Sequence, residues 1–226
     1  MNNENQITPP NDATDKQDFL LSVAEELFAE HGFDGTSIRM IAEQSGMNVA
    51  MISYYFGSKE KMFEELIGRK VAHMRTLAQQ MDDMKDCDAW HKLVYLVEGY
   101  TDRIINNQAS FHKLMMREIS LRKRPAIVQL IEERIATNMG IIRNVLTEGI
   151  SAGIFRSDIE LPMLIIVIFG SINHTVSAKN LIMKMSILEG KPVALTPEDL
   201  REKVKEGLKV VLARYMLVNP AHYNLQ

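Results

Sequence analysis

The 226-residue chain carries a net charge of −3, with 46% hydrophobic and 24% charged residues, which is the composition of an ordinary globular protein and excludes a fibrous or low-complexity one. Its single cysteine, Cys87, excludes an intrachain disulfide, and its longest apolar run, residues 163–169, is far shorter than the roughly 20 residues of a membrane span. We therefore expect a cytoplasmic protein with no membrane-spanning segment. The polar residues 1–14, which include two prolines, predict a disordered tail.

A first helix is predicted over residues 15–31, where apolar side chains recur at the three- and four-residue spacing of one helix face. Thr14, with Gln17 three residues later, fits a capping box at its start. Gly32 suits the left-handed position that ends a helix.

Two short helices around a tight turn are predicted over residues 36–56. Thr36 is a good N-cap for the first helix, Gly46 makes the turn, and Asn48 caps the second helix. Two short amphipathic helices joined in this way form the helix-turn-helix pattern. In that pattern the second helix enters the major groove of DNA and the first crosses the phosphate backbone.

The charges of this region have an uneven distribution. Residues 15–70 carry six basic and ten acidic side chains, whereas most nucleic-acid-binding domains are basic. However, no acidic residue lies between Glu43 and Glu60. The second short helix therefore has no charge that would repel phosphate.

The rest of the chain also has a helical pattern, without a convincing strand, repeat or Gly/Ser linker. Ser58 is predicted to cap a long helix that continues to about residue 84, and the later helices are predicted to start near Asp88, Phe111, Pro125, Pro162 and Thr196. The predicted fold class is all-α. An N-terminal three-helix DNA-binding head over residues 15–75 precedes a C-terminal helical core over residues 76–226.

Six short motifs occur in order between residues 19 and 66. They are Gly32, Thr36-Ser37, Ile41-Ala42, Gly46-Met47, Tyr54-Tyr55-Phe56 and Lys59-Glu60. In this order they resemble the TetR family of bacterial transcriptional repressors. Residues 148–158, EGISAGIFRSD, are similar to the loop after the long seventh helix of that family.

This resemblance implies that the C-terminal helices bind a small effector and dimerise. The last two predicted helices are also more apolar than the surface helices of a monomer need to be, which favours a homodimer. We expect a sequence-specific repressor that an unknown small-molecule effector releases from a double-stranded DNA operator. A helical dimerisation or interaction module without DNA binding is the alternative, favoured by the acidic head and by Ser53, where most family members carry Tyr.

The candidate DNA contacts lie at the start of the first short helix, on the second and just beyond it: Thr36, Ser37, Arg39, Asn48, Val49, Ala50, Met51, Ser53, Tyr54, Tyr55 and Lys59. Hydroxyl and backbone N–H groups at a helix start can hold a phosphate, although simple capping is the alternative. Arg39 can reach a phosphate or a base edge, or remain solvated. The apolar residues 49–51 can pack on thymine methyl groups, which predicts an A·T-rich operator, although Met51 can also belong to the core. The resemblance implies backbone contacts for Tyr54, Tyr55 and Lys59.

No catalytic constellation is visible. The six histidines show no HExxH motif and no metal-ligand spacing, so we expect neither an enzyme nor a metal or other cofactor. Polar residues on the apolar C-terminal helices are candidates for an effector pocket, with satisfied core groups as the alternative: Tyr95, Tyr100, His112, Asn173 and His174. The basic cluster at residues 122–124 is predicted to be a solvated loop.

Overall fold

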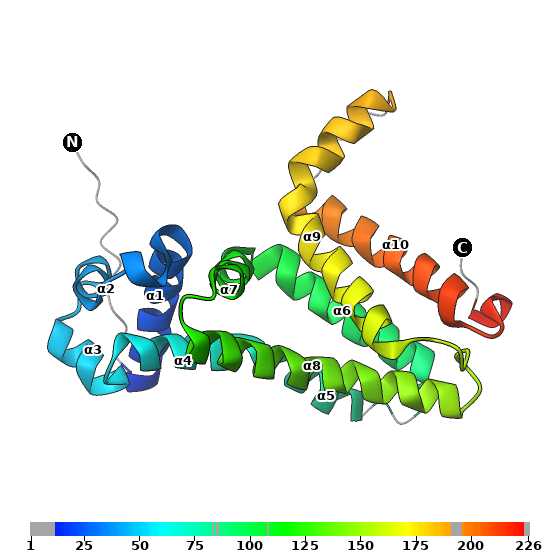
Figure 1. Cartoon of the computed structure of the whole chain (residues 1–226), viewed down its shortest axis with the longest axis horizontal. Coiled ribbons are helices and arrows are strands. Elements are labelled where there is room, and N and C mark those ends of the chain that lie inside the picture. Colours follow the sequence, from blue (N-terminus) through cyan, green and yellow to red (C-terminus); the bar gives the residue numbers. More distant parts are fainter. Residues whose placement is uncertain (1–11, 83, 85, 108, 191–195, 224–226) are drawn as a thin grey trace. The chain divides into compact units, whose positions relative to one another are not determined.

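The computed structural model describes residues 12–82, 84, 86–107, 109–190 and 196–223. Their secondary structure is helical apart from an isolated bridge between Phe155 and Leu217 (Figure 1). The all-α prediction is confirmed. The predicted tail lies largely outside the described residues, and the first helix begins at Ala13.

The chain divides into two compact units, residues 1–71 with 110–134 and residues 72–109 with 135–226. We call the first the head unit and the second the core unit. The sequence-based boundary at residues 75 and 76 placed residues 110–134 in the core, whereas the structure groups them with the head. A boundary drawn along the sequence misses this because the segment returns to the head through contacts made far apart in the chain.

The head unit begins with α1 (Ala13–Gly35), α2 (Ile38–Ser45), α3 (Val49–Phe56) and α4 (Lys59–Val71). The predicted turn is confirmed, since Gly46 is left-handed with φ 67°. The predicted capping of α3 is also confirmed, since the Asn48 side chain accepts a hydrogen bond from the Met51 N–H at 2.7 Å.

Two predicted caps are wrong by one or two residues. α1 is capped by Asp12, whose carboxylate accepts from the Thr14 N–H at 3.2 Å, so Thr14 does not start the helix. α2 is capped by Ser37, whose hydroxyl accepts from the Met40 N–H at 3.1 Å, and not by Thr36. In both cases residues one or two positions apart have similar capping chemistry, so the local sequence does not decide between them.

Three phenylalanines form the centre of the head unit. Phe28 stacks on Phe33 with ring centroids 5.5 Å apart, and each meets the edge of Phe63 at 5.1 Å. The chain turns back into this cluster at Gly32, whose φ of 77° is costly for any residue with a Cβ. The corner between α1 and α2, residues 32–37, is therefore fixed by packing.

The head unit also contains α7 (Ala109–Leu121) from Ser110 onward and the first turns of α8 (Pro125–Ser151). Arg124, just before α8, pairs with the buried carboxylate of Glu118 on α7 at 2.6 Å and with Asp34 on α1. The prediction of a solvated loop at residues 122–124 is therefore wrong for Arg124.

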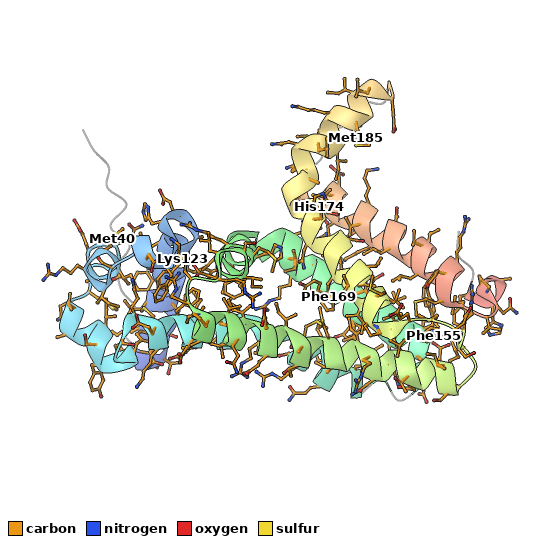
Figure 2. All side chains as sticks on the ribbon, in the orientation of Figure 1. Met40, Lys123, Phe155, Phe169, His174 and Met185 are labelled. Carbon is orange, nitrogen blue, oxygen red and sulfur yellow. The ribbon has the colours of Figure 1, made fainter. Side chains whose placement is uncertain are left out.

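The core unit comprises α5 (His73–Asp82), α6 (Ala89–Asn107), the rest of α8, α9 (Leu161–Leu188), α10 (Pro197–Met216) and a short 3₁₀ turn, η1 (Pro220–Tyr223). The single helix predicted from residue 58 to about 84 is interrupted at Ala72, whose carbonyl accepts from the N–H groups of Arg75 and Thr76 at 3.0 and 3.2 Å. α6, α8, α9 and α10 enclose one apolar core. It includes Leu93, Leu96, Leu146, Ile168, Ile172 and Leu212, with Phe169 labelled in Figure 2.

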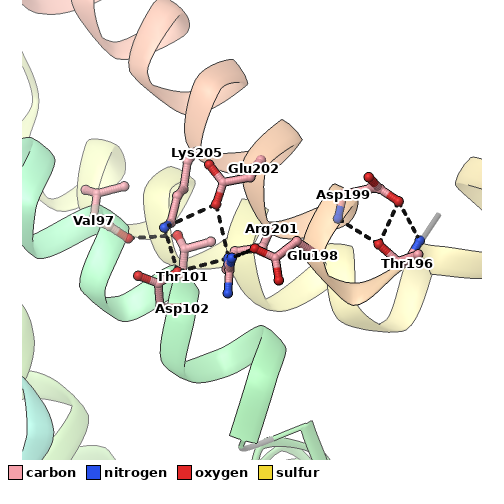
Figure 3. Close-up of polar contacts among 9 residues, drawn as sticks. All are labelled: Val97, Thr101, Asp102, Thr196, Glu198, Asp199, Arg201, Glu202 and Lys205. Carbon is pink, nitrogen blue, oxygen red and sulfur yellow. Dashed lines mark hydrogen bonds and ion pairs between the residues drawn. The ribbon is translucent and has the colours of Figure 1, made fainter.

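A polar seam joins α6 to α10 (Figure 3). Asp102 on α6 pairs with Lys205 at 2.6 Å and with Arg201 at 3.4 Å. The start of α10 has the predicted Thr196 cap, and Asp199 completes a capping box with it. This side of α10 is thus occupied within the unit. Among the described helices none is by itself long and apolar enough to cross a membrane. Two parts of α9, Leu161–Thr175 and Ala178–Leu188, are together long and apolar enough for a membrane span by length and composition alone, but a 79° bend separates them.

Candidate nucleic-acid interface

One side of α3 is exposed and carries no charge. Its exposed side chains are Val49, Ala50, Ser53 and Tyr54, with Val49 42% and Tyr54 84% exposed. Ile52 and Phe56, on the other side, are buried in the head unit. α3 therefore presents a short, mostly apolar surface of the size and chemistry that suit base edges and thymine methyl groups.

Met51 and Tyr55 lie at the border of this surface. Both are half-buried, and the Tyr55 ring lies 5.4 Å from that of Tyr54. The prediction grouped Met51 with the exposed residues of α3. In the structure the Met51 side chain lies partly on the surface and partly in the core, because its position on the helix falls between the exposed and the buried face.

Positive charge beside α3 comes from its neighbours. Arg39 is exposed on α2, the helix that carries Met40 in Figure 2, and Lys61 is exposed in the first turn of α4. The start of α2 adds the Ser37 hydroxyl, which accepts from the Met40 N–H at 3.1 Å and keeps its own proton for a phosphate oxygen.

Lys59 has a different environment from the one expected. Its ammonium group donates to the carbonyl oxygens of Phe33 and Thr36, both at 2.8 Å, and lies 4.3 Å from the centre of the Phe33 ring. These contacts join the start of α4 to the corner between α1 and α2. The signal that could have indicated them is the aromatic residue after the helix-ending glycine, but its partner lies 26 residues away.

The side chains of Thr36 and Asn48 are also engaged. Thr36 is 1% exposed, and its hydroxyl directs its proton toward the carbonyls of Gly32 at 2.9 Å and Leu27 at 3.0 Å. The hydroxyl proton is therefore already engaged within the head unit, and a phosphate contact at Thr36 stays a prediction for its backbone N–H. Asn48 is exposed, but its oxygen is occupied by the α3 cap, so only its amide NH₂ remains for a base.

The candidate effector residues are only partly brought together. Tyr100 on α6 donates to the Asn173 oxygen on α9 at 3.1 Å, and its ring meets the edge of Phe169 at 4.6 Å. Burial raises the pKa of Tyr100 to about 12. Tyr95 instead bonds Gln80 at 2.8 Å, and His174 is exposed.

His112 belongs to the head unit and not to the core unit. It is buried, and desolvation lowers its pKa. Its neutral form is therefore favoured, as expected for a histidine in the core. The described residues contain no group of three or more His, Cys, Asp or Glu side chains that could hold a metal ion.

An open pocket of about 430 Å³ lies between α5 and α8 in the core unit. Its lining combines apolar and polar groups: Arg75, Ala78, Gln79, Met81, Ile141, Asn144, Val145 and Glu148. None of the five predicted effector residues is among them. This pocket could not be predicted from the sequence, because its lining residues have the ordinary pattern of two amphipathic helices.

A helix-turn-helix head with an exposed, uncharged second helix, followed by a long helical core, defines a DNA-binding transcriptional regulator. Residues 20–66 match the model of the bacterial regulatory proteins of the tetR family, and residues 63–189 match that of the YsiA-like protein C-terminal region. The chain belongs to the TetR family of transcriptional regulators.

Two curated relatives are similar over most of the chain. The fatty acid metabolism regulator protein of Bacillus subtilis is 27% identical over 165 residues, which cover 70% of this chain and 80% of the relative. The transcriptional repressor NicS of Pseudomonas putida is 27% identical over 175 residues, which cover 72% of this chain and 79% of the relative.

Solved structures show the same fold. FadR from Bacillus subtilis in complex with stearoyl-CoA has a TM-score of 0.63 at 22% identity, covering 85% of this chain and 96% of that one. The ketosteroid regulator KstR2 of Mycobacterium tuberculosis has a TM-score of 0.66 at 20% identity, covering 94% of this chain and all of that one, 100%.

Proposed function

We propose that this regulator is a homodimeric repressor that holds an operator through two copies of α3 and leaves it when a small molecule binds the core unit. The observation that carries the proposal is the exposed surface of α3, formed by Val49, Ala50, Ser53 and Tyr54, which has no role inside the head unit. The names of the relatives, which include transcriptional repressors, support repression in place of activation.

The proposed DNA contacts are the predicted residues that remain available. Base contacts come from Val49, Ala50 and Ser53, and phosphate contacts come from Ser37, Arg39 and Tyr54, with Met51, Tyr55 and the Asn48 amide at the edge of the surface. Thr36 and Lys59 contribute through their backbone and through the geometry of the corner. Short apolar side chains favour A·T pairs, as the sequence predicted.

A salt titration of operator binding tests this assignment. The logarithm of the binding constant falls with the logarithm of the salt concentration by about 0.9 per phosphate contact. Arg39→Ala should lower that slope by about one contact and weaken binding to all sequences alike. If Arg39→Ala changes the preferred base and leaves the slope unchanged, Arg39 reads a base edge. If the wild type binds no DNA at low salt, the alternative of an interaction module holds.

The dimer is proposed to form through α9 and α10. Both helices expose large apolar side chains at spacings of three and four residues: Met163, Ile166 and Val167 on α9, and Val211, Tyr215 and Val218 on and just after α10. A monomer rarely leaves so many apolar side chains in water. A two-fold contact between the α9–α10 pairs would bury them on both subunits.

The proposed effector is a long-chain acyl thioester. Support comes from the similarity of the chain to a fatty acid metabolism regulator and to a structure that holds stearoyl-CoA, together with the match of residues 63–189 to a C-terminal regulator domain. Tyr100 and Asn173 are the proposed polar groups for its carbonyl region, since they lie together in an otherwise apolar core.

Operator release in the presence of stearoyl-CoA tests the effector class, with stearate alone and coenzyme A alone as comparisons. Release by stearoyl-CoA and not by either part supports a thioester effector. Release by stearate alone restricts the effector to a fatty acid. If no acyl compound changes operator affinity or thermal stability, the effector class is wrong, while the assignment of the DNA-binding surface is unaffected.

A further inference from the structure

Three elements meet at Arg124 in the head unit. Its guanidinium group pairs with Glu118 of α7 at 2.6 Å and with Asp34 at the end of α1, and its central carbon lies 4.4 Å from the centre of the Phe33 ring. The Glu118 side chain is only 2% exposed. A carboxylate so deeply buried requires its partner, because an unpaired buried charge is strongly destabilising.

The corner that Arg124 holds is the one on which the orientation of α2 depends. Phe33 and Asp34 lie four and three residues before Ser37, the cap of α2. The same Phe33 ring is contacted by the ammonium group of Lys59. Two cations from α4 and from the α7–α8 turn thus fix one ring, and a displacement of either one changes the support of the helix-turn-helix motif.

α8 continues from this corner into the core unit without a break. It is one helix from Pro125 to Ser151, and its residues from 135 onward belong to the core unit. There Ile142, Val145 and Leu146 are buried in the apolar core, and Glu148 pairs with Lys92 of α6 at 2.7 Å. Each end of α8 is therefore anchored in a different unit.

The crossing from the head unit to the core unit at residues 71 and 72 is interrupted. α4 ends at Val71 and α5 starts at His73, with Ala72 between them in a turn. The sequence predicts a single helix over this stretch. An interrupted helix can absorb a displacement by bending, whereas an uninterrupted one carries it along its axis.

We propose that Arg124 is the positioning residue that couples the core unit to DNA binding, with α8 as the transmitting helix. The coupling to an effector rests on the proposed function. When α8 is displaced, Arg124 moves with it and shifts Phe33 and Asp34. The corner before α2 therefore takes a different arrangement for each of two positions of α8. This is a change at a packed, bistable contact.

The test compares Arg124→Met with Lys123→Met in the full-length protein. Lys123 is the exposed neighbour in the same turn, and its charge acts on Asp34 only through space, so its substitution removes an equal charge and leaves the ion pairs of Arg124 in place. Because Arg124→Met leaves Glu118 unpaired, a double variant, Glu118→Met with Arg124→Met, removes both charges and preserves packing if the single variant does not fold.

The first measurement is amide hydrogen exchange with and without operator DNA, which needs no effector. In the wild type and in Lys123→Met, DNA binding should slow exchange in α8 residues 135–151. In the Arg124 variants that bind DNA, the slowing should stay within the head unit. Equal slowing of residues 135–151 in all variants would overturn the proposal.

The second measurement is operator affinity with and without stearoyl-CoA. Allosteric couplings are typically about 5–150-fold, and the Arg124 variants should retain less than about a threefold effect while still binding stearoyl-CoA by thermal shift. A coupling equal to that of the wild type would contradict the role of Arg124. If stearoyl-CoA does not release the wild-type protein from its operator, the proposed effector is wrong. The hydrogen-exchange measurement then decides the role of Arg124 by itself.

Discussion

The ammonium group of Lys59 lies 4.3 Å from the centre of the Phe33 ring and donates to the Phe33 carbonyl at 2.8 Å. Lys59 was expected to contact DNA phosphate through its charge. In the structure its ammonium group instead links α4 to the corner that supports α2. The two roles can be distinguished, because loss of a phosphate contact changes the salt dependence of DNA binding, whereas loss of an internal contact changes the stability of the fold.

Substitution of Lys59 by Ala should destabilise the protein by about 1–3 kcal/mol, because it leaves two backbone carbonyls without their donor. The salt slope of operator binding should change by less than about half of the 0.9 expected for a lost phosphate contact. Urea unfolding and a salt titration measure the two effects. Lys61→Ala, in the same turn but exposed, is the control and should stay within about 0.5 kcal/mol of wild-type stability. A slope change of one full contact with normal stability would restore the phosphate role.

Substitutions at Val49 and Met51 should separate the reading surface of α3 from its edge. Val49→Ala should alter the preferred bases and cost about 1–3 kcal/mol per lost base contact, because Val49 is exposed on the proposed DNA side. Met51→Ala should alter them less, since Met51 is half-buried. Selection from a random DNA pool compares the two variants with the wild type. A G·C-rich wild-type consensus, or a larger change for Met51 than for Val49, would contradict apolar readout by this surface.

Substitution of Val211 by Glu should yield folded monomers. Val211 is 58% exposed in the single chain, so a carboxylate there costs little in the monomer and much in the proposed apolar interface. Sedimentation with circular dichroism measures both properties. Lys209→Glu is the control on α10, where an exposed residue is already charged. Leu208→Glu does not suit this test, because Leu208 is buried within the subunit and its substitution should unfold it. A Val211→Glu variant that remains dimeric would exclude α10 from the interface.

The stability of the core unit should depend on Tyr100 at alkaline pH. Burial raises the pKa of Tyr100 to about 12 in the folded protein, against an ordinary value of about 10. A group whose folded pKa is raised contributes stability that is fully present below the unfolded pKa and is lost as the pH rises through the folded pKa. Between about pH 10 and 12 the wild type should therefore lose stability faster than Tyr100→Phe. Urea unfolding across that range measures the difference. If the free energy of unfolding falls equally with pH in the two proteins, folding does not raise the pKa of Tyr100.

The helix-turn-helix motif could be predicted from the sequence, because it depends on local chemistry. Gly46 must take a left-handed conformation, and the Asn48 side chain reaches an N–H only three residues away. The capping box of Thr196 and Asp199 is also complete within three residues. Such features depend on neighbours along the chain, and the order of the six motifs is in itself sufficient to indicate the TetR family.

The tertiary structure decided what the side chains of this motif do. Thr36 and Ser37 are adjacent and chemically alike, yet packing of the α1–α2 corner buries the Thr36 hydroxyl against backbone carbonyls and leaves Ser37 as the cap. Lys59 has a partner 26 residues away, and Arg124 pairs with Asp34 at a separation of 90 residues. Periodicity in the sequence carries no information on such pairs, because each partner alone has the pattern of an exposed residue. The roles of Lys59 and Arg124 arise only when distant segments bury a carboxylate, a ring or a carbonyl that needs a cation.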